Sequence, residues 1–189
     1  MNWNRKAIFE SALILLLAGA LVGCGSKEET KEDPNPEVKD QEEVKANYSI
    51  VEAMKHIEAT NTVEEINAII GFEATTDAMI GSDPIWKFDS DNWISFETFG
   101  DDDVTIRATI DKESIKNDNI SIPKTSDLQE ALNNGSFTYE ELVQKIGGEG
   151  TLTSISKGSR IYTWVDKSGI RLSATFNNES GKCTIASYR

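Results

Sequence analysis

The chain has 189 residues, and 32 acidic side chains against 19 basic ones give it a net charge of −13. So acidic a protein repels the phosphates of a nucleic acid, and the composition therefore excludes a nucleic-acid partner. Two cysteines are present, Cys24 and Cys183, which allow at most one intrachain disulfide.

Residues 1–23 have the pattern of a secretory signal peptide. Arg5 and Lys6 precede the apolar run Ala12–Val22, which is too short to span a bilayer comfortably. The run ends in "LVGC", which resembles the bacterial lipobox. The resemblance implies cleavage before Cys24 and attachment of diacylglycerol to its sulfur, with palmitate as the expected acyl chain. The alternative is an uncleaved membrane anchor in which the cysteine occurs by chance.

Residues 24–48 are predicted to be a disordered tether that begins at the lipidated Cys24. The stretch "SKEETKEDPNPEVKDQEEVKAN" holds eight acidic residues, four lysines and two prolines, and almost nothing to bury. A flexible chain of this length reaches about 25–30 Å, which holds the folded part off the membrane. Because acylation would occupy Cys24, Cys183 has no cysteine to pair with, and we predict no disulfide.

Capping boxes predict four helix starts. In a capping box the side-chain oxygen of a Ser or Thr accepts from the backbone N–H three residues later, and the side chain of that later residue accepts from the backbone N–H of the Ser or Thr. The boxes are Ser49–Glu52, Thr62–Glu65, Ser126–Gln129 and Thr138–Glu141. The second pair follows the first at offsets of 77 and 76 residues. Gly71 and Gly147 are expected to close the second helix of each pair, where a left-handed cap favours glycine. The same devices recur in the same order, which predicts a duplicated folding unit.

After each helix pair the hydrophobic period changes towards two, which predicts strands. The expected strand segments are 74–80, 84–99 with a turn inside, 104–110, 151–157, 160–176 with a turn inside, and 183–188. Residues 112–124 are the connector, with Ile120 and Ile122 as its anchors. The predicted fold class is α+β: a tandem repeat of helix, helix and four antiparallel strands, forming one curved eight-stranded sheet with helices on one face. The first repeat with its connector is 49–124, and the second repeat is 125–189.

Alternation along the strands predicts which side chains face the helices. The apolar parity is Ile94/Phe96, Val104/Ile106/Ala108/Ile110, Ile170/Leu172/Ala174/Phe176 and Cys183/Ile185. The opposite parity is polar with aromatic residues among it: Trp93, Ser95, Glu97, Phe99, Thr105, Arg107, Thr109, Arg171, Ser173, Thr175, Thr184, Ala186 and Tyr188. The second strand of each repeat stays ambiguous, because Trp86/Phe88 and Tyr162/Trp164 compete with Ile85 and Ile161 for the core.

The second repeat resembles the β-lactamase inhibitory protein-like family of tandem-repeat lipoproteins. The motifs are "FTYEELVQKIGGEGTLTSIS" (137–156), Tyr162-Thr163-Trp164 and Ala174-Thr175-Phe176; the first repeat has Trp86-Lys87-Phe88 in place of the second motif. The resemblance implies a concave eight-stranded sheet and a protein-binding role. The inhibitor of that family is disulfide-bonded, whereas this chain is predicted to have no disulfide. The family's inhibitory contacts lie outside the matching motifs, so no contact residue is transferred to this chain. The sequence also resembles, more distantly, outer-membrane assembly lipoproteins that have one such unit.

No set of residues predicts catalysis, so we expect no enzyme, no cofactor and no metal. His56 is the only histidine and is expected at a helix surface or half-buried, and Cys183 is expected in the core. The acidic groups Asp89/Asp91 and Asp101–Asp103 lack the spaced loop of a calcium site and are interpreted as hairpin tips.

The charge is divided unevenly between the repeats. Residues 49–124 hold 16 acidic and 6 basic side chains, whereas residues 125–189 hold seven of each. One interpretation is solubility; the other is electrostatic steering of an unknown protein partner that has a basic patch.

The polar face of the sheet is predicted to bind the partner, because aromatic residues and arginine dominate interface energies. The predicted contacts are Trp93, Phe99, Arg107, Arg171 and Tyr188, with Asp89 and Asp91 at the rim. The alternative is that some of these aromatics merely cover the sheet. The predicted function is a lipid-anchored protein-binding module on the extracytoplasmic side of the cell membrane. An envelope-assembly or structural lipoprotein without a discrete ligand is the alternative, and a small-ligand binder ranks third.

Overall fold

The computed structural model describes residues 45–77, 81–99, 103–123 and 125–189. The predicted signal peptide, Cys24 and most of the predicted tether lie outside the described residues, as do Asp101 and Asp102. Asn47 already belongs to the fold, because its backbone N–H donates to the Ile70 carbonyl oxygen at 2.8 Å. The folded part therefore begins at least two residues before the predicted boundary at Ser49.

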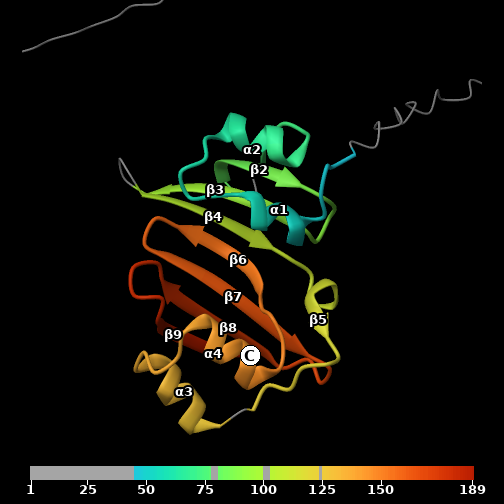
Figure 1. Cartoon of the computed structure of the whole chain (residues 1–189). Coiled ribbons are helices and arrows are strands. Elements are labelled where there is room, and N and C mark those ends of the chain that lie inside the picture. Colours follow the sequence, from blue (N-terminus) through green and yellow to red (C-terminus); the bar gives the residue numbers. More distant parts are fainter. Residues whose placement is uncertain (1–44, 78–80, 100–102, 124) are drawn as a thin grey trace, which may run out of the picture. The chain divides into compact units, whose positions relative to one another are not determined.

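The described residues form an α+β fold with four α-helices and one nine-stranded sheet (Figure 1). The elements from the N-terminal side are α1 (Ile50–His56), α2 (Val63–Ile70), β1 (Thr75–Asp77), β2 (Gly81–Lys87), β3 (Trp93–Phe99) and β4 (Asp103–Thr109). A 3-10 turn (Glu113–Ile115) and the short strand β5 (Lys116–Asn117) follow. The remaining elements are α3 (Ser126–Asn133), α4 (Tyr139–Ile146), β6 (Thr151–Ser156), β7 (Ser159–Asp166), β8 (Arg171–Asn177) and β9 (Cys183–Tyr188).

Local capping explains where the helices begin and end. Thr62 and Thr138 both form the complete capping boxes predicted from the sequence, and Ser49 accepts from the Glu52 N–H. Gly71 and Gly147 close α2 and α4 in the left-handed region, at φ 97° and 92°.

The predicted start of α3 is one residue too late. Thr125, not Ser126, is its N-cap, because the Thr125 hydroxyl accepts from the Leu128 N–H at 3.3 Å. The Ser126 hydroxyl instead donates to the neighbouring Asp127 carboxylate at 3.3 Å. Two hydroxyl residues in succession offer alternative caps, and the spacing to Gln129 selected the wrong one.

The sheet is continuous, with strand order β1-β2-β3-β4-β6-β7-β8-β9 and antiparallel pairing throughout this path. Strands β4 and β6 join the two halves, with Ile106 opposite Ile155 and Arg107 opposite Ser154. The predicted α+β class with one antiparallel sheet is confirmed. The ninth strand, β5, was not predicted; it pairs in parallel with the end of β7, beyond the last residue of β7 that pairs with β6.

All four described helices pack on the same face of the sheet. Side chains of α1 and α2 share one cluster with Trp86, Ile94 and Ile106, and side chains of α3 and α4 share a second with Trp164, Leu172 and Phe176. The pairs Ile106–Ile155, Ile155–Arg160 and Arg160–Phe176 run across the sheet, and cross-strand partners point to the same side. Figure 1 shows α1 and α4 in front of the strands. The opposite side, which these helices leave uncovered, is called the open face below.

Two tryptophans anchor the core and settle the ambiguous strand. Trp86 and Trp164 are 0% and 1% exposed, and each indole N–H donates inside the protein, to Asn67 Oδ1 at 2.8 Å and to the Gly148 carbonyl oxygen at 2.9 Å. Trp86 therefore faces the helices. Ile85, which has the opposite parity, is also fully buried, although it belongs to neither helix-side cluster.

The connector between the two halves is fastened as predicted, because Ile120 and Ile122 are both buried in the second cluster. A buried carboxylate holds it in place as well: Asp166 Oδ2 accepts from the Ile122 N–H at 3.3 Å. The other Asp166 oxygen accepts from the N–H groups of Ser168 and Ile170 and from the Ser168 hydroxyl. Burial works against the charged form, but these hydrogen bonds keep the pKa of Asp166 below its usual value.

Candidate interaction surface on the open face of the sheet

The strand register places four predicted contact residues on the open face. Trp93 lies opposite Thr109, Phe99 opposite Asp103, Arg107 opposite Ser95, and Arg171 opposite Val165. Their neighbours along β3, β4 and β8 alternate with them and point into the helix-side core, as the parity predicted. Alternation therefore located this part of the face correctly.

The two predicted aromatic contacts do not form one cluster. Trp93 is the first residue of β3 and is half-buried, whereas Phe99 is the last and is 58% exposed. Five residues lie between them, and the six steps along the strand amount to about 20 Å. A partner that contacts both must therefore extend along the whole length of β3.

The predicted rim residues are part of a hydrogen-bonded turn. Asp89 Oδ1 accepts from the backbone N–H groups of Asp91 and Asn92 at 2.7 and 2.8 Å, and the Asn92 amide donates to both Asp89 oxygens. The Asn92 side chain and the Asp91 N–H lower the pKa of Asp89 by stabilising its charged form. Asp89 thus shapes the turn between β2 and β3, and Asp91 stays exposed beside it. Of the second acidic tip, only Asp103 is described, at the start of β4.

Tyr188 does not face the open side, so its predicted orientation is wrong. A bulge shifts the register where β8 meets β9: Thr175 lies opposite Ile185, but Phe176 lies opposite Cys183. The extra residue reverses the parity after Cys183, and Tyr188 lies opposite the core residue Leu172 and packs on the second cluster. Its hydroxyl is buried without a hydrogen-bond partner, and burial raises the pKa of Tyr188.

The same bulge exposes a residue that the sequence assigned to the core. Ile185 was placed with the apolar parity, yet it is 64% exposed and, as the partner of Thr175, lies on the open face. Ala186, predicted to face solvent, is buried. Ile185 and Phe99 are large apolar side chains that this face leaves in water, on β9 and β3 respectively.

A hollow of about 290 Å³ lies in the middle of the open face and is called the central hollow here. It is lined by Arg107, Ala108, Thr153, Ser154, Ile161, Thr163, Arg171, Ser173, Ser187 and Arg189. Three guanidinium groups and five hydroxyls therefore surround it, and no acidic side chain is among these lining residues. Arg107 and Arg171 were predicted contacts; Arg189 was missed because it lies beyond the last predicted strand.

Hydroxyl groups form a chain across the floor of the central hollow. Thr153 Oγ1 lies 3.1 Å from Thr163 Oγ1, which lies 3.0 Å from Ser173 Oγ. Thr153 reaches this face because β6 has a bulge between Leu152 and Ser154. Hydroxyl hydrogens rotate to suit their partners, so the chain can donate in either direction.

The three arginines differ in how they are held. Arg107 Nη2 lies 3.4 Å from Glu97 Oε2, and Glu97 also accepts from the Ser95 hydroxyl at 3.1 Å. Among the described residues, no hydrogen bond or ion pair engages the guanidinium of Arg171 or Arg189. Two of the three charges are thus available to a ligand.

No family model, curated protein or solved structure matches this chain significantly. The resemblance to the β-lactamase inhibitory protein-like family therefore stays a prediction from sequence motifs. In the part of the chain that the structure describes, no helix is long and apolar enough to cross a membrane.

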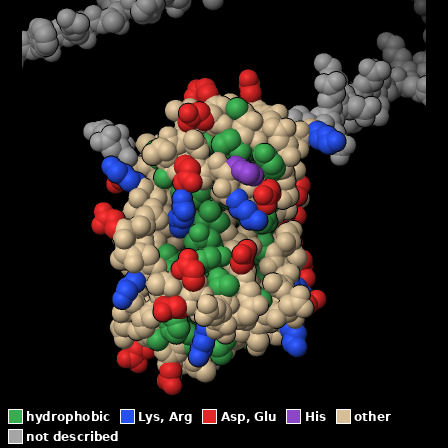
Figure 2. All heavy atoms as spheres, in the orientation of Figure 1, with side chains coloured by type: hydrophobic (Ala, Val, Ile, Leu, Met, Phe, Trp, Pro, Cys, Tyr) green, Lys and Arg blue, Asp and Glu red, His purple; other side chains and the backbone are tan. Residues whose placement is uncertain are grey.

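A second hollow, of about 400 Å³, lies on the helix side and was not predicted. Its lining is mixed: Val51, Leu152, Tyr139 and Tyr162 stand beside the charged side chains of Lys55, Glu58, Glu149 and Arg160. Figure 2 shows hydrophobic side chains gathered between charged ones on this side. Arg160 Nη2 and Glu58 Oε2 form an ion pair at 2.6 Å across its edge. The pair joins residues 102 positions apart, which no local pattern in the sequence reveals.

The described residues offer no group of three or more side chains that could hold a metal ion. His56 is exposed, as predicted, where its ring stacks on Tyr48 and its Nε2 lies 3.5 Å from Glu52 Oε1. Cys183 is buried, also as predicted, and burial raises the pKa of its thiol to about 11. A thiol with so high a pKa is almost entirely protonated at neutral pH, when it is a poor nucleophile.

Proposed function

We propose that the chain is a lipoprotein anchored to the cell membrane on its extracytoplasmic side, and that its folded part binds another protein through the open face. The observation that supports the binding role is the surface itself. It combines exposed Phe99 and Ile185 with the arginine-lined central hollow, on a side of the sheet that none of the described helices covers. Aromatic residues and arginine are enriched at binding hot spots.

The proposed architecture is a tandem repeat similar to that of the β-lactamase inhibitory protein-like family. Three features support it. The order helix, helix, four strands occurs twice; the complete capping boxes of α2 and α4 are 76 residues apart; and both of these helices end in a left-handed glycine. A repeat of this kind places two sets of strands edge to edge, which gives an open face twice as wide as one unit offers.

The lipid anchor rests on the sequence "LVGC" and gives the first prediction. Cys24→Ala will leave the precursor uncleaved and unlabelled in cells grown with radioactive palmitate, because the substitution removes the only sulfur that could carry the lipid at that site. The wild-type chain will be labelled and shortened. Cys183→Ala is the matched control and should be labelled like the wild type, since Cys183 is buried. Equal labelling of Cys24→Ala and wild type would remove the lipoprotein assignment.

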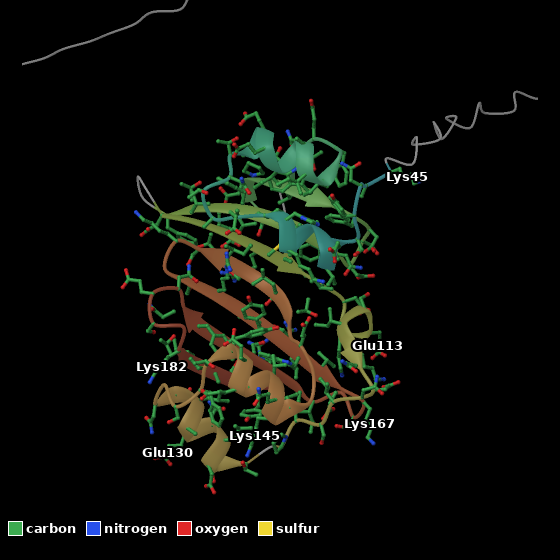
Figure 3. All side chains as sticks on the ribbon, viewed as in Figure 1. Lys45, Glu113, Glu130, Lys145, Lys167 and Lys182 are labelled. Atoms are coloured by element: carbon green, nitrogen blue, oxygen red, sulfur yellow. The ribbon has the colours of Figure 1, made fainter. Side chains whose placement is uncertain are left out.

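The binding face is tested by site-specific photo-crosslinking in the native envelope. A benzophenone amino acid in place of Phe99 or Ile185 should capture a discrete protein, because both side chains project from the open face. The same amino acid in place of Lys145, on α4 and labelled in Figure 3, is the helix-side control and should capture none. Adducts from Lys145 alone would place the partner on the other side and refute the proposal.

With the captured protein purified, the third prediction concerns affinity. Phe99→Ala and Arg107→Ala should each weaken binding about 5–30-fold, or about 1–2 kcal/mol, mainly by raising the dissociation rate. Both side chains are more than half exposed, so the midpoint of thermal unfolding should be the same in each variant as in the wild type. Biolayer interferometry gives both rates. An affinity within about twofold of wild type for both variants would show that these side chains are not hot spots.

A further inference from the structure

The central hollow has a charge opposite to that of the protein as a whole. The chain carries −13, and residues 49–124 hold 16 acidic side chains against 6 basic ones, yet the hollow is lined by three arginines and no acidic side chain. Arg171 and Arg189 lie directly opposite each other, where like charges repel, and a bound anion relieves that repulsion. The local surface therefore attracts an anion while the molecule as a whole repels polyanions.

The groups around the hollow are nearly all hydrogen-bond donors or able to act as donors. Arg171 and Arg189 present free guanidinium groups from adjacent strands, and the backbones of these two residues pair at 2.9 Å in both directions. Guanidinium groups hold carboxylates with two parallel hydrogen bonds.

The hydroxyls complete this donor set. Ser154 lies opposite Arg107 and Ser187 opposite Ser173, and neither Ser154 nor Ser187 uses its side chain in a hydrogen bond within the described structure. The chain Thr153–Thr163–Ser173 can turn so that Ser173 donates towards the hollow. An anion in the hollow would thus find charged donors on Arg171 and Arg189, and neutral hydroxyl donors beside them.

We propose that the central hollow is an anion site that receives a carboxylate side chain from the protein partner, so that the contacting segment of the partner is acidic. This inference rests on the proposed function. At about 290 Å³ the hollow lies at the lower limit of small-molecule pockets, a size that suits one side chain better than a free cofactor. A single carboxylate also suits a chain of −13 better than a multiply charged phosphate does. The acidic residues at the β2–β3 turn can still steer a basic part of the partner.

The test is an NMR titration of the full chain in detergent micelles. The signals followed are the Nε–Hε pairs of the arginines, and the probes are N-acetyl-glutamate methylamide, the matching glutamine compound and inorganic phosphate. The glutamate probe should shift the Nε–Hε signals of Arg171 and Arg189 until they saturate, with a dissociation constant of about 1–10 mM. Added salt should weaken this binding. The glutamine probe should cause no saturable shift. Saturable binding of phosphate without binding of glutamate would overturn the carboxylate assignment.

Charge-removing variants locate the site. Arg171→Gln and Arg189→Gln should each weaken glutamate binding about tenfold, or about 1.4 kcal/mol. The control variants are Lys167→Gln at the β7–β8 turn and Lys145→Gln on α4, both labelled in Figure 3, which remove one positive charge elsewhere. They should change the affinity for glutamate less than about twofold. Arg189 is exposed at the end of β9, so its variant keeps the test valid if Arg171→Gln misfolds. Equal effects of arginine and lysine variants would refute a defined site.

The failure of this inference can be told apart from the failure of the proposed function. If crosslinks form from Phe99 and Ile185 but glutamate does not bind, the open face binds a protein and the carboxylate site is refuted. If glutamate binds at Arg171 and Arg189 but crosslinks form only from Lys145, the anion site stands and the protein-binding face is refuted.

Discussion

A chain that ends at Lys124 will not fold into a stable monomer. Truncation there removes β6 to β9, and β4 becomes an edge strand whose residues Thr105–Arg107 lose their backbone partners. Ile106, fully buried in the intact sheet, loses Ile155 opposite it, and the first core cluster also loses Val165 and the packing of Leu152. An exposed edge beside an exposed apolar strand favours association with other chains.

The measurement compares the truncated and the full chain by size-exclusion chromatography and by thermal unfolding followed with circular dichroism. The full chain should elute as one species and unfold in one cooperative step. The truncated chain should form large aggregates or lose the cooperative transition. A fragment that unfolds cooperatively as a monomer would show that the two halves are independent, against the continuous sheet.

A cut chain serves as the control for chain length. A protease site placed between Pro123 and Ser126 allows the backbone to be cleaved after folding. The β4–β6 pairing and the shared core cluster should then keep both halves together in one peak. If this cut chain separates into stable halves, the missing strands do not explain why the truncated chain fails to fold cooperatively.

Features fixed by neighbouring residues could be predicted from the sequence. The capping boxes of Thr62 and Thr138 depend on groups three residues apart, and the left-handed caps depend on one glycine each. Alternation located the faces of β3, β4 and β8, because β3 pairs with β4, and β8 with β7, without interruption.

Features fixed by contacts distant in the sequence could not be predicted. The bulge in β9 reversed the assignments of Ile185 and Tyr188, and the bulge in β6 brought Thr153 to the open face. A bulge adds one residue to one strand, so its effect on parity is visible only when the partner strand is known. The central hollow depends on both bulged strands and on β4, which is why Arg107 and Arg171 could be identified from the sequence, but Arg189 and the complete hydroxyl floor could not.

Removing either buried tryptophan will cost much of the stability of the fold. Trp164 is 1% exposed, and its indole N–H donates to the Gly148 carbonyl oxygen at 2.9 Å. Trp164→Ala and Trp86→Ala should each lower the free energy of unfolding by about 3–5 kcal/mol, because a large cavity opens and a buried hydrogen bond is lost. Domains of this size are typically stable by about 5–15 kcal/mol, so either variant approaches the limit of folding.

Trp93 is the matched control, since it is half-buried at the open face. Trp93→Ala should cost about 1 kcal/mol or less in urea unfolding. Trp86→Phe and Trp164→Phe keep most of the ring volume and separate the hydrogen bond from the cavity. Asn67 Oδ1 still accepts from the Ala74 N–H at 3.0 Å, so the phenylalanine variant should be tolerated better at Trp86 than at Trp164. Equal losses from Trp93→Ala and Trp164→Ala would contradict the assignment of the core.

The packing of Trp164 can be tested from the opposite side with a glycine. A Cβ on Gly150 would lie 2.5 Å from the Trp164 ring, whereas a Cβ on Gly158 would meet nothing within 4 Å. Gly150→Ala should therefore lower stability by about 1–3 kcal/mol through overpacking, and Gly158→Ala should leave it nearly unchanged. In the Trp164→Ala background the ring is gone, and the penalty of Gly150→Ala should largely disappear, which a double-mutant cycle measures as a coupling energy. Purely additive effects would mean that the ring does not pack on Gly150.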